Sequence, residues 1–292
     1  MSVAAANAEA RAVALHKRGA SREALCVLSV GIRRDPDAAG LRMLRATIYH
    51  ARRDWAAALN DAEVAQLLTP LPVGMQLVLG DCYARTGRAE LALLAYRHLL
   101  TCGPLPHDLY AGLYAGFRGL GRHRAALDVC RAAVEAEPEN HAAYFGMAHC
   151  MASLGYAASY IAAVLRSAVG LDPQNSVYRA SLAIQLVRAA EPAEAYKQLR
   201  RVAVDALDSV GCRCSARKLL ELCVWADDQP RAEKLGDVVR RLAERAAAPA
   251  AWEEPGPQRS GQAKAADGPP TDAPQTDVPE TDANDNGIQG GR

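Results

Sequence analysis

Residues 79–100 read LGDCYARTGRAELALLAYRHLL. Alanine and leucine, which favour helix, dominate on both sides of Gly87, and a glycine ends a helix at little cost. Gly80 and Ala92 are small at the two places where paired helices would approach each other, and Tyr83 is large enough to fill the space beside them. The stretch therefore predicts two short helices joined by a tight turn.

The same pattern recurs along the chain with a period of about 34 residues. Five prolines mark the period, because proline is tolerated between helices and in the first turn of the next helix. They are spaced by 34, 34, 34 and 35 residues, at Pro36, Pro70, Pro104, Pro138 and Pro173. A fixed period of this length indicates a stack of helix–turn–helix units that bury their apolar faces against one another.

The period predicts six regular units and one degenerate unit. The regular units are residues 5–38, 39–72, 73–106, 107–140, 141–175 and 176–209, and the degenerate unit, which lacks the proline, is 211–247. The fifth unit contains one extra residue, for which we expect a local bulge or a changed helix angle. Residues 248–292 are rich in Pro, Gly, Thr and Asp and hold three basic and eight acidic residues, which predicts a disordered acidic tail.

The repeat pattern resembles that of the tetratricopeptide repeat (TPR) family. The matching residues of the third unit are Leu79, Gly80, Tyr83, Gly87, Ala92, Tyr96 and Pro104. The resemblance covers about residues 5–245 and implies an all-α fold, a right-handed α-solenoid of about seven helix–turn–helix repeats. It also implies a non-catalytic scaffold or adaptor for protein–protein interaction.

In TPR proteins the first helices of successive units line a concave groove, and the resemblance implies the same here. The candidate binding residues at the family's groove positions are Met43, Thr47, His50, Leu77, Asp81, Arg85, Arg118, Phe145, His149, Ile184 and Arg188. The same positions hold Glu9, Val13, His16 and Lys17 in the first unit and Ala111 and Ala115 in the fourth. Because apolar and basic residues alternate, we expect a partner protein or peptide that carries some acidic groups.

Some TPR proteins clamp the acidic C-termini of heat-shock chaperones, but the residues of that clamp are absent. The clamp uses Lys and Asn in one unit and Asn in the next, whereas the first pair of units here has Glu9, Val13 and Leu44. We therefore do not expect chaperone tails as partners. A chaperone-like factor for a secretion or assembly system is an alternative function, and self-association through an exposed end of the solenoid is another.

The charge and hydropathy of the chain argue against two other classes of partner, nucleic acids and membranes. The chain has 292 residues, a formal net charge of +1 and no run rich in Lys and Arg, which argues against nucleic-acid binding. No apolar stretch is long enough for membrane insertion, and Glu9 and Arg11 interrupt the N-terminal segment before a signal peptide could form. These features predict a cytoplasmic protein whose eight cysteines stay reduced.

No catalytic, cofactor-binding or metal site is expected. Cys82 and Cys150 take the place that alanine has in the first unit, which predicts small buried core residues. His149 and Cys150 are adjacent, so on a helix their side chains point about 100° apart and form no catalytic dyad. Only Cys212 and Cys214 look accessible; a metal or redox protein built on this pair is a further alternative, although the second half of a usual metal motif is missing.

Overall fold

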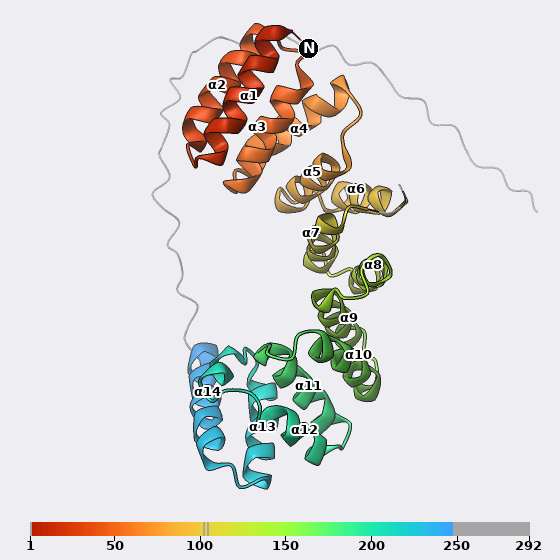
Figure 1. Ribbon diagram of the computed structural model, residues 1–292, viewed down its shortest axis with the longest axis vertical. Helices are drawn as coiled ribbons and strands as arrows, with labels where there is room; N and C mark the ends of the chain where they lie inside the picture. Colours follow the sequence, from red (N-terminus) through yellow and green to blue (C-terminus); the bar gives the residue numbers. More distant parts are fainter. Residues whose placement is uncertain (1, 102, 104, 248–292) are drawn as a thin grey trace, which may run out of the picture. The chain divides into compact units, whose positions relative to one another are not determined.

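The structure is a computed structural model that describes residues 2–101, 103 and 105–247. These residues form fourteen α-helices and one short 3₁₀-helix, and none of them lies in a β-strand (Figure 1). The all-α prediction is therefore confirmed for this part of the chain. The predicted acidic tail, residues 248–292, lies outside the described residues.

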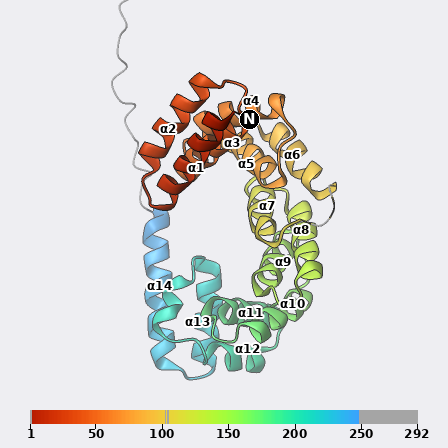
Figure 2. The same ribbon diagram turned by 45° about the horizontal axis from the view of Figure 1, so that its top comes forward.

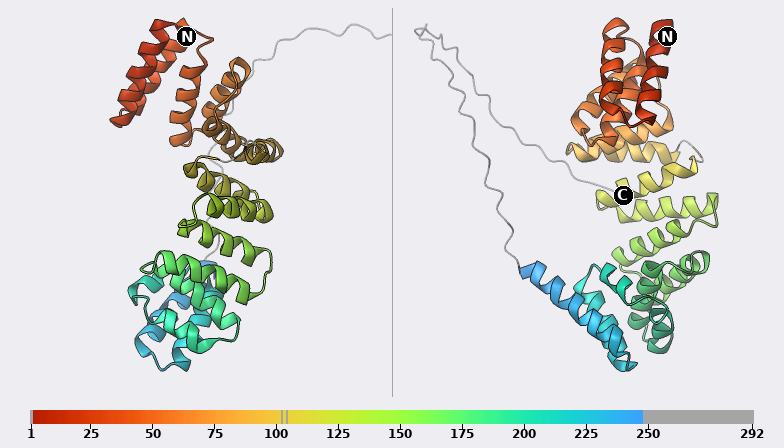
Figure 3. Two further views of the ribbon diagram at one scale, coloured as in Figure 1. Left: turned by 45° about the vertical axis from the view of Figure 1, so that its right-hand side comes forward. Right: turned by 60° about the vertical axis from the view of Figure 1, so that its left-hand side comes forward.

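The helices come in pairs joined by short turns. The first helices of the pairs are α1 (Val3–Lys17), α3 (Ala39–Ala51), α5 (Val73–Arg85), α7 (His107–Gly119), α9 (His141–Ser153), α11 (Ser176–Arg188) and α13 (Arg213–Trp225). The second helices are α2 (Ser21–Arg34), α4 (Trp55–Leu68), α6 (Ala89–Thr101), α8 (His123–Ala136), α10 (Ala158–Leu171), α12 (Pro192–Leu199) and α14 (Gln229–Ala247). The longest is α14, which is blue in Figure 3.

The odd-numbered and even-numbered helices form two layers. Each odd-numbered helix packs against the even-numbered helix that follows it. The odd-numbered helices α1, α3, α5, α7 and α9 also contact one another in order, as α11 and α13 do. The rings of Phe145 and Tyr178 join α9 to α11. Figure 2 shows α3, α5, α7, α9 and α11 following one another along the inner side of a curve, with α4, α6, α8, α10 and α12 along its outer side. The first helices of the repeats thus share one face, as a groove on that layer requires.

The turn within each pair has the same backbone conformation. Its second residue has a positive φ in all seven described pairs: Gly19, Arg53, Gly87, Gly121, Gly155, Ala190 and Asp227. Glycine adopts this conformation freely, whereas an L-residue with a Cβ is disfavoured by about 1–2 kcal/mol. Because three pairs keep the geometry without glycine, the packing of the two helices imposes the turn.

Small buried residues let the helices of each pair approach closely. Six alanines at the predicted packing positions are completely buried: Ala12, Ala24, Ala46, Ala58, Ala92 and Ala126. The large side chains beside these contacts complete the core, among them Leu28, Tyr96 and Phe117, which are also inaccessible to solvent. The pattern of small and large residues in the sequence is therefore the packing pattern of the structure.

Tyr96 of α6 joins three helices. Its ring fits between Gly80 of α5 and Gly116 of α7, where an added Cβ would lie 2.6 and 2.5 Å from ring carbons. Its Oη donates a hydrogen bond of 2.6 Å to Asp81 Oδ1, and its ring lies 5.4 Å from that of Phe117, centroid to centroid. The two glycines are thus needed for the close approach of the tyrosine.

The fifth pair accommodates its extra residue in the turn. α9 ends at Ser153 and α10 begins at Ala158, so four residues separate the helices where the other pairs have three. α10 is a regular fourteen-residue helix, as α2, α4 and α8 are. The expected bulge is therefore not found within α10. Ile161 is buried at the place where alanine packs in the earlier pairs.

The sixth pair departs further, in a way that the sequence did not indicate. α12 ends after eight residues at Leu199, and the 3₁₀-helix η1 (Asp205–Ser209) follows it. Carbonyl groups at the end of a helix need hydrogen-bond donors. Arg231 of α14 supplies them, because its Nη2 donates to the carbonyls of Arg200 and Val202 at 2.7 and 2.9 Å. Asp228, 3.0 Å from Arg231 Nη1, holds the guanidinium in place.

Candidate functional site

The predicted groove residues of the third pair lie in a network of side chains. Asp81 Oδ2 is 3.2 Å from His50 Nε2, so this contact joins α5 to α3. The other carboxylate oxygen accepts the hydrogen bond from Tyr96, whose pKa is raised by burial and then by this hydrogen bond. Arg85 places its guanidinium carbon 5.4 Å from the ring centroid of Trp55. His50 and Asp81, which are both predicted groove residues, therefore bind each other.

Three other predicted residues belong to the same two helices, α3 and α5. Met43 and Thr47 line a shallow depression of about 420 Å³ between α3 and α5, where Thr47 Oγ1 lies 3.9 Å from Met75 Sδ. Leu77 differs, because it is 8% exposed and its side chain fills the space beside Gly112 of α7. We therefore assign Leu77 to the packing of α5 against α7, and the groove surface excludes it.

A deeper cavity lies between α7, α8 and α9. Its volume is about 450 Å³, and three predicted groove residues line it: Arg118, Phe145 and His149. Tyr114 and Cys130 also line it, and Gly146 leaves the room that they occupy, since a Cβ there would lie 2.8 Å from Cys130 Sγ. The wall is thus mainly apolar and aromatic, with a cation at its edge.

The charge in this cavity comes from Arg118. Its guanidinium carbon lies 5.8 Å from the centroid of Tyr114, and its side chain is exposed. Burial of part of the ring lowers the pKa of His149, and the positive charges of Arg118 and His123 lower it further. Burial raises the pKa of Tyr114 to about 12. At neutral pH the cavity therefore presents the Arg118 cation, the neutral imidazole of His149 and the neutral phenol of Tyr114.

A second cavity adjoins the first. Its volume is about 340 Å³, and it shares Phe145 and His149 with the first while adding Ile184 and Arg188 of α11. The rings of Phe145 and Tyr178 pack 4.8 Å apart, which supports the shared wall. Five predicted groove residues on three odd-numbered helices therefore line the two adjoining cavities: Arg118, Phe145, His149, Ile184 and Arg188.

Solved structures resemble this arrangement of helices. The C-terminal part of a TPR repeat-containing protein from Cytophaga hutchinsonii has a TM-score of 0.63 and 13% identity, over 81% of this chain and 95% of that one. A tetratricopeptide repeat protein from Parabacteroides merdae has a TM-score of 0.58 and 14% identity, over 83% and 93%. The chain has the tetratricopeptide-repeat fold. No protein-family model matches the sequence, and no curated protein matches it significantly.

A third structure with the TPR fold is described as binding a peptide. YrrB, a TPR protein with an unusual peptide-binding site, has a TM-score of 0.52 and 16% identity, over 69% of this chain and 97% of its own. At such identities the comparison establishes the fold alone. The α-solenoid implied by the repeat pattern is thus confirmed, while the groove residues stay a prediction.

Several residues that line the two adjoining cavities were not predicted from the sequence. Tyr114 occupies a position that is alanine or glycine in the other regular units. A large residue at this position indicates that the helices of the fourth unit pack differently. Gln185 and Cys212 line the second cavity but lie outside the family's groove positions. Nothing in the repeat pattern indicates that Cys212, at the start of the degenerate unit, lines the same cavity as Arg188.

The buried cysteines behave as expected for packing residues. Burial raises the pKa of Cys82 and of Cys130 to about 12 and that of Cys223 to about 11. Cys82 and Cys150 are completely buried, which confirms their predicted place in the core. Cys212 and Cys214 are exposed. Among the described residues, no group of three or more His, Cys, Asp or Glu side chains is arranged to hold a metal ion.

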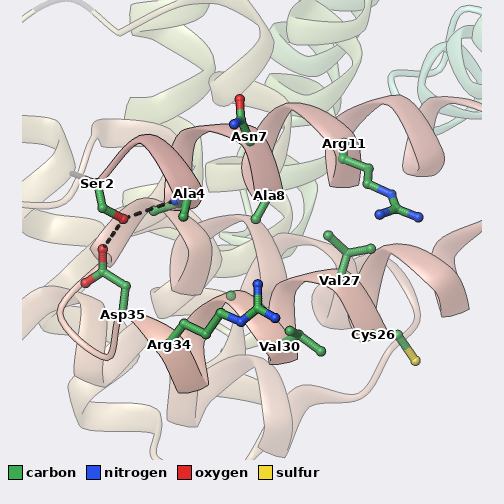
Figure 4. Close-up of a pocket in the computed structure, with 12 residues that line it drawn as sticks. Ser2, Ala4, Asn7, Ala8, Arg11, Cys26, Val27, Val30, Arg34 and Asp35 are labelled. Carbon is green, nitrogen blue, oxygen red and sulfur yellow. Dashed lines mark hydrogen bonds between the residues drawn. The ribbon is translucent and has the colours of Figure 1, made fainter.

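Another cavity lies between α1 and α2, away from the predicted groove residues. It has a volume of about 550 Å³ and is lined by Val27, Val30, Arg11 and Arg34 among others (Figure 4). Ser2 closes one end, because its Oγ donates to Asp35 Oδ2 at 2.9 Å. No predicted groove residue lines this cleft.

Over the described residues, no helix is long and apolar enough to cross a membrane.

Proposed function

We propose that the protein is a non-catalytic interaction scaffold that binds a partner peptide along its odd-numbered helices. The observation that carries this proposal is the pair of adjoining cavities between α7 and α13, about 450 and 340 Å³ in volume. Cavities of about 300–1,000 Å³ with apolar walls and a few polar groups are typical binding sites. Because they share Phe145 and His149, one ligand can occupy both.

The side chains of the two cavities suit a particular kind of peptide. Tyr114, Phe145 and Ile184 provide apolar surface for an aliphatic or aromatic side chain. Arg118 and Arg188 are exposed at the two ends and can each pair with a carboxylate. The ligand that fits is a segment with an apolar anchor flanked by acidic residues. YrrB supports a peptide as the ligand, since a peptide-binding site is described on the same fold.

The proposal can be tested by selecting ligands on the full-length chain from a displayed random-peptide library. We expect selected peptides to combine an apolar residue with Asp or Glu. The double substitution Arg118→Glu and Arg188→Glu should weaken the best peptide about 10-fold or more, because two charge pairs at about 1 kcal/mol each are lost.

The matched control carries the same change of charge on the other layer. Arg97 of α6 and Arg131 of α8 are exposed on even-numbered helices, so Arg97→Glu with Arg131→Glu should leave the affinity within about twofold. Equal loss in both double variants would show that only net charge matters. Selected peptides without acidic residues, or affinity unchanged in the Arg118 and Arg188 variant, would overturn the proposed groove.

A further inference from the structure

Two cysteines at the start of α13 form a close pair. Cys212 immediately precedes the helix and Cys214 is its second residue, and their sulfur atoms lie 3.3 Å apart. Both side chains are exposed. The other described cysteines differ: Cys82, Cys130, Cys150 and Cys223 are buried, and only Cys26 is also exposed. Cys212 and Cys214 are thus the described thiols that are both accessible and adjacent.

The surroundings of Cys212 stabilise a thiolate. Its pKa is lowered to about 7, first by the backbone N–H of Ser215 and then by the Cys214 thiol. The start of a helix also carries partial positive charge. The ionisable side chains around the pair are those of α13 and of the facing helices: Arg213, Arg217, Lys218, Glu221, Arg188 and His149. Low-pKa, exposed and electropositive cysteines are the reactive ones.

A cavity adjoins this thiol. Cys212 and Ser215 line the pocket of about 340 Å³ together with Arg188 and Gln185. Gln185 is 9% exposed, and its Oε1 is buried without a hydrogen-bond partner in the structure. The wall of the pocket therefore contains an amide whose oxygen has no partner and a cation, together with a nucleophilic sulfur. Peptide-like thiol compounds carry amide N–H groups and carboxylates, which match these two groups.

We propose that Cys212 and Cys214 form a thiol–disulfide exchange site that reacts with peptide-like disulfides of low molecular weight. The Cys212 thiolate attacks one sulfur of the small disulfide, which forms a mixed disulfide and releases the other half as a thiolate. Cys214 then loses its proton to water and attacks Cys212 Sγ, which forms the Cys212–Cys214 disulfide and releases the second half. The protein pair loses two electrons, and the small disulfide gains them.

The first experiment maps thiol reactivity on the full-length protein. Native chain is treated briefly with iodoacetamide between pH 5.5 and 9.5, and the labelled cysteines are counted by peptide mass spectrometry. Cys212 should reach half of its maximal rate near pH 7 and be labelled first. Cys26 is the internal control for an exposed thiol outside such a pair. Labelling of Cys212 no faster than Cys26 at pH 7 would overturn the assignment.

The second experiment uses glutathione disulfide as the probe. Wild-type chain should end with an internal Cys212–Cys214 disulfide and no retained glutathione. Cys214→Ser should stop at the mixed disulfide on Cys212, and Cys212→Ser should react at least threefold more slowly near pH 7, because it lacks the thiol whose lowered pKa favours the thiolate.

Three results would contradict the proposal: a stable mixed disulfide on the wild-type chain, equal rates for Cys212→Ser and wild type, or stoichiometric zinc in the purified protein that blocks labelling of Cys212. Since both side chains are exposed, we expect each serine variant to keep the wild-type circular dichroism spectrum and melting temperature.

Discussion

Replacing Gly116 by alanine should weaken the contact between α6 and α7, although alanine is the better helix former. The new Cβ would lie 2.5 Å from Tyr96 Cζ, 2.7 Å from Oη and 2.8 Å from Cε2. The ring cannot withdraw easily, because Gly80 of α5 touches its other edge and Asp81 accepts its hydroxyl hydrogen bond at 2.6 Å. The clash must therefore move the helices or the tyrosine.

The expected change in the free energy of unfolding follows from two opposing effects. Alanine in place of glycine stabilises a helix by up to about 1 kcal/mol. Overpacking a fixed core costs about 1–3 kcal/mol. Gly119 is the matched control, because it lies on the same helix α7 and an added Cβ there meets no atom within 4 Å. Gly116→Ala should therefore be about 1–3 kcal/mol less stable than Gly119→Ala.

The comparison is made by urea unfolding followed by circular dichroism, with both substitutions also placed in a Tyr96→Leu background. Removing the ring should reduce the difference between Gly116→Ala and Gly119→Ala to about 0.5 kcal/mol or less, since the coupling is between contacting residues. If Gly116→Ala is as stable as Gly119→Ala in the wild-type background, the packing described for Tyr96 is wrong.

Two further perturbations test the core. Asp61→Ala should destabilise the fold by about 3 kcal/mol, because it leaves Arg45, 2.6 Å away, without its carboxylate partner. Glu63→Ala should cost less than about 1 kcal/mol, because Glu63 is partly exposed and its ion pair with Arg88 is at the surface; the midpoints of urea unfolding measure both changes. Stability should fall above about pH 8.5, because unfolded thiols ionise while Cys82 and Cys130 keep their protons up to about pH 12. Replacing both cysteines by alanine should reduce the fall in melting temperature between pH 8 and 10. If the melting temperature of this variant falls as steeply as that of the wild-type chain, the buried thiols are not the cause of the pH dependence.

The repeat was readable from the sequence because its determinants are local. Small residues such as Ala92, the turn glycine at Gly87 and the inter-unit prolines recur at fixed spacing, and each acts on its immediate neighbours in the chain. The left-handed turns at Arg53, Ala190 and Asp227 show that the fold also overrides local preference where helix packing requires it. The repeat pattern therefore predicted the fold correctly, even though some units lack one of its typical residues.

The site was less predictable because its side chains meet partners far along the chain. Asp81 was expected to face the groove, but its contacts with His50 and Tyr96 depend on the exact approach of three helices. Leu77 has a groove position but is buried against Gly112, which only the spacing of α5 and α7 determines. Periodicity gives the face of a helix, and it does not give the depth at which a side chain lies.

The most direct test of the proposed function measures the affinity of a library-selected peptide for two alanine variants by calorimetry. Phe145 lines both groove cavities, whereas Tyr160 is 67% exposed on α10 of the other layer. Phe145→Ala should weaken binding at least 10-fold, as expected for a central aromatic anchor, with Tyr160→Ala unchanged. Equal affinity of both variants and the wild-type chain would contradict a binding groove on the odd-numbered helices.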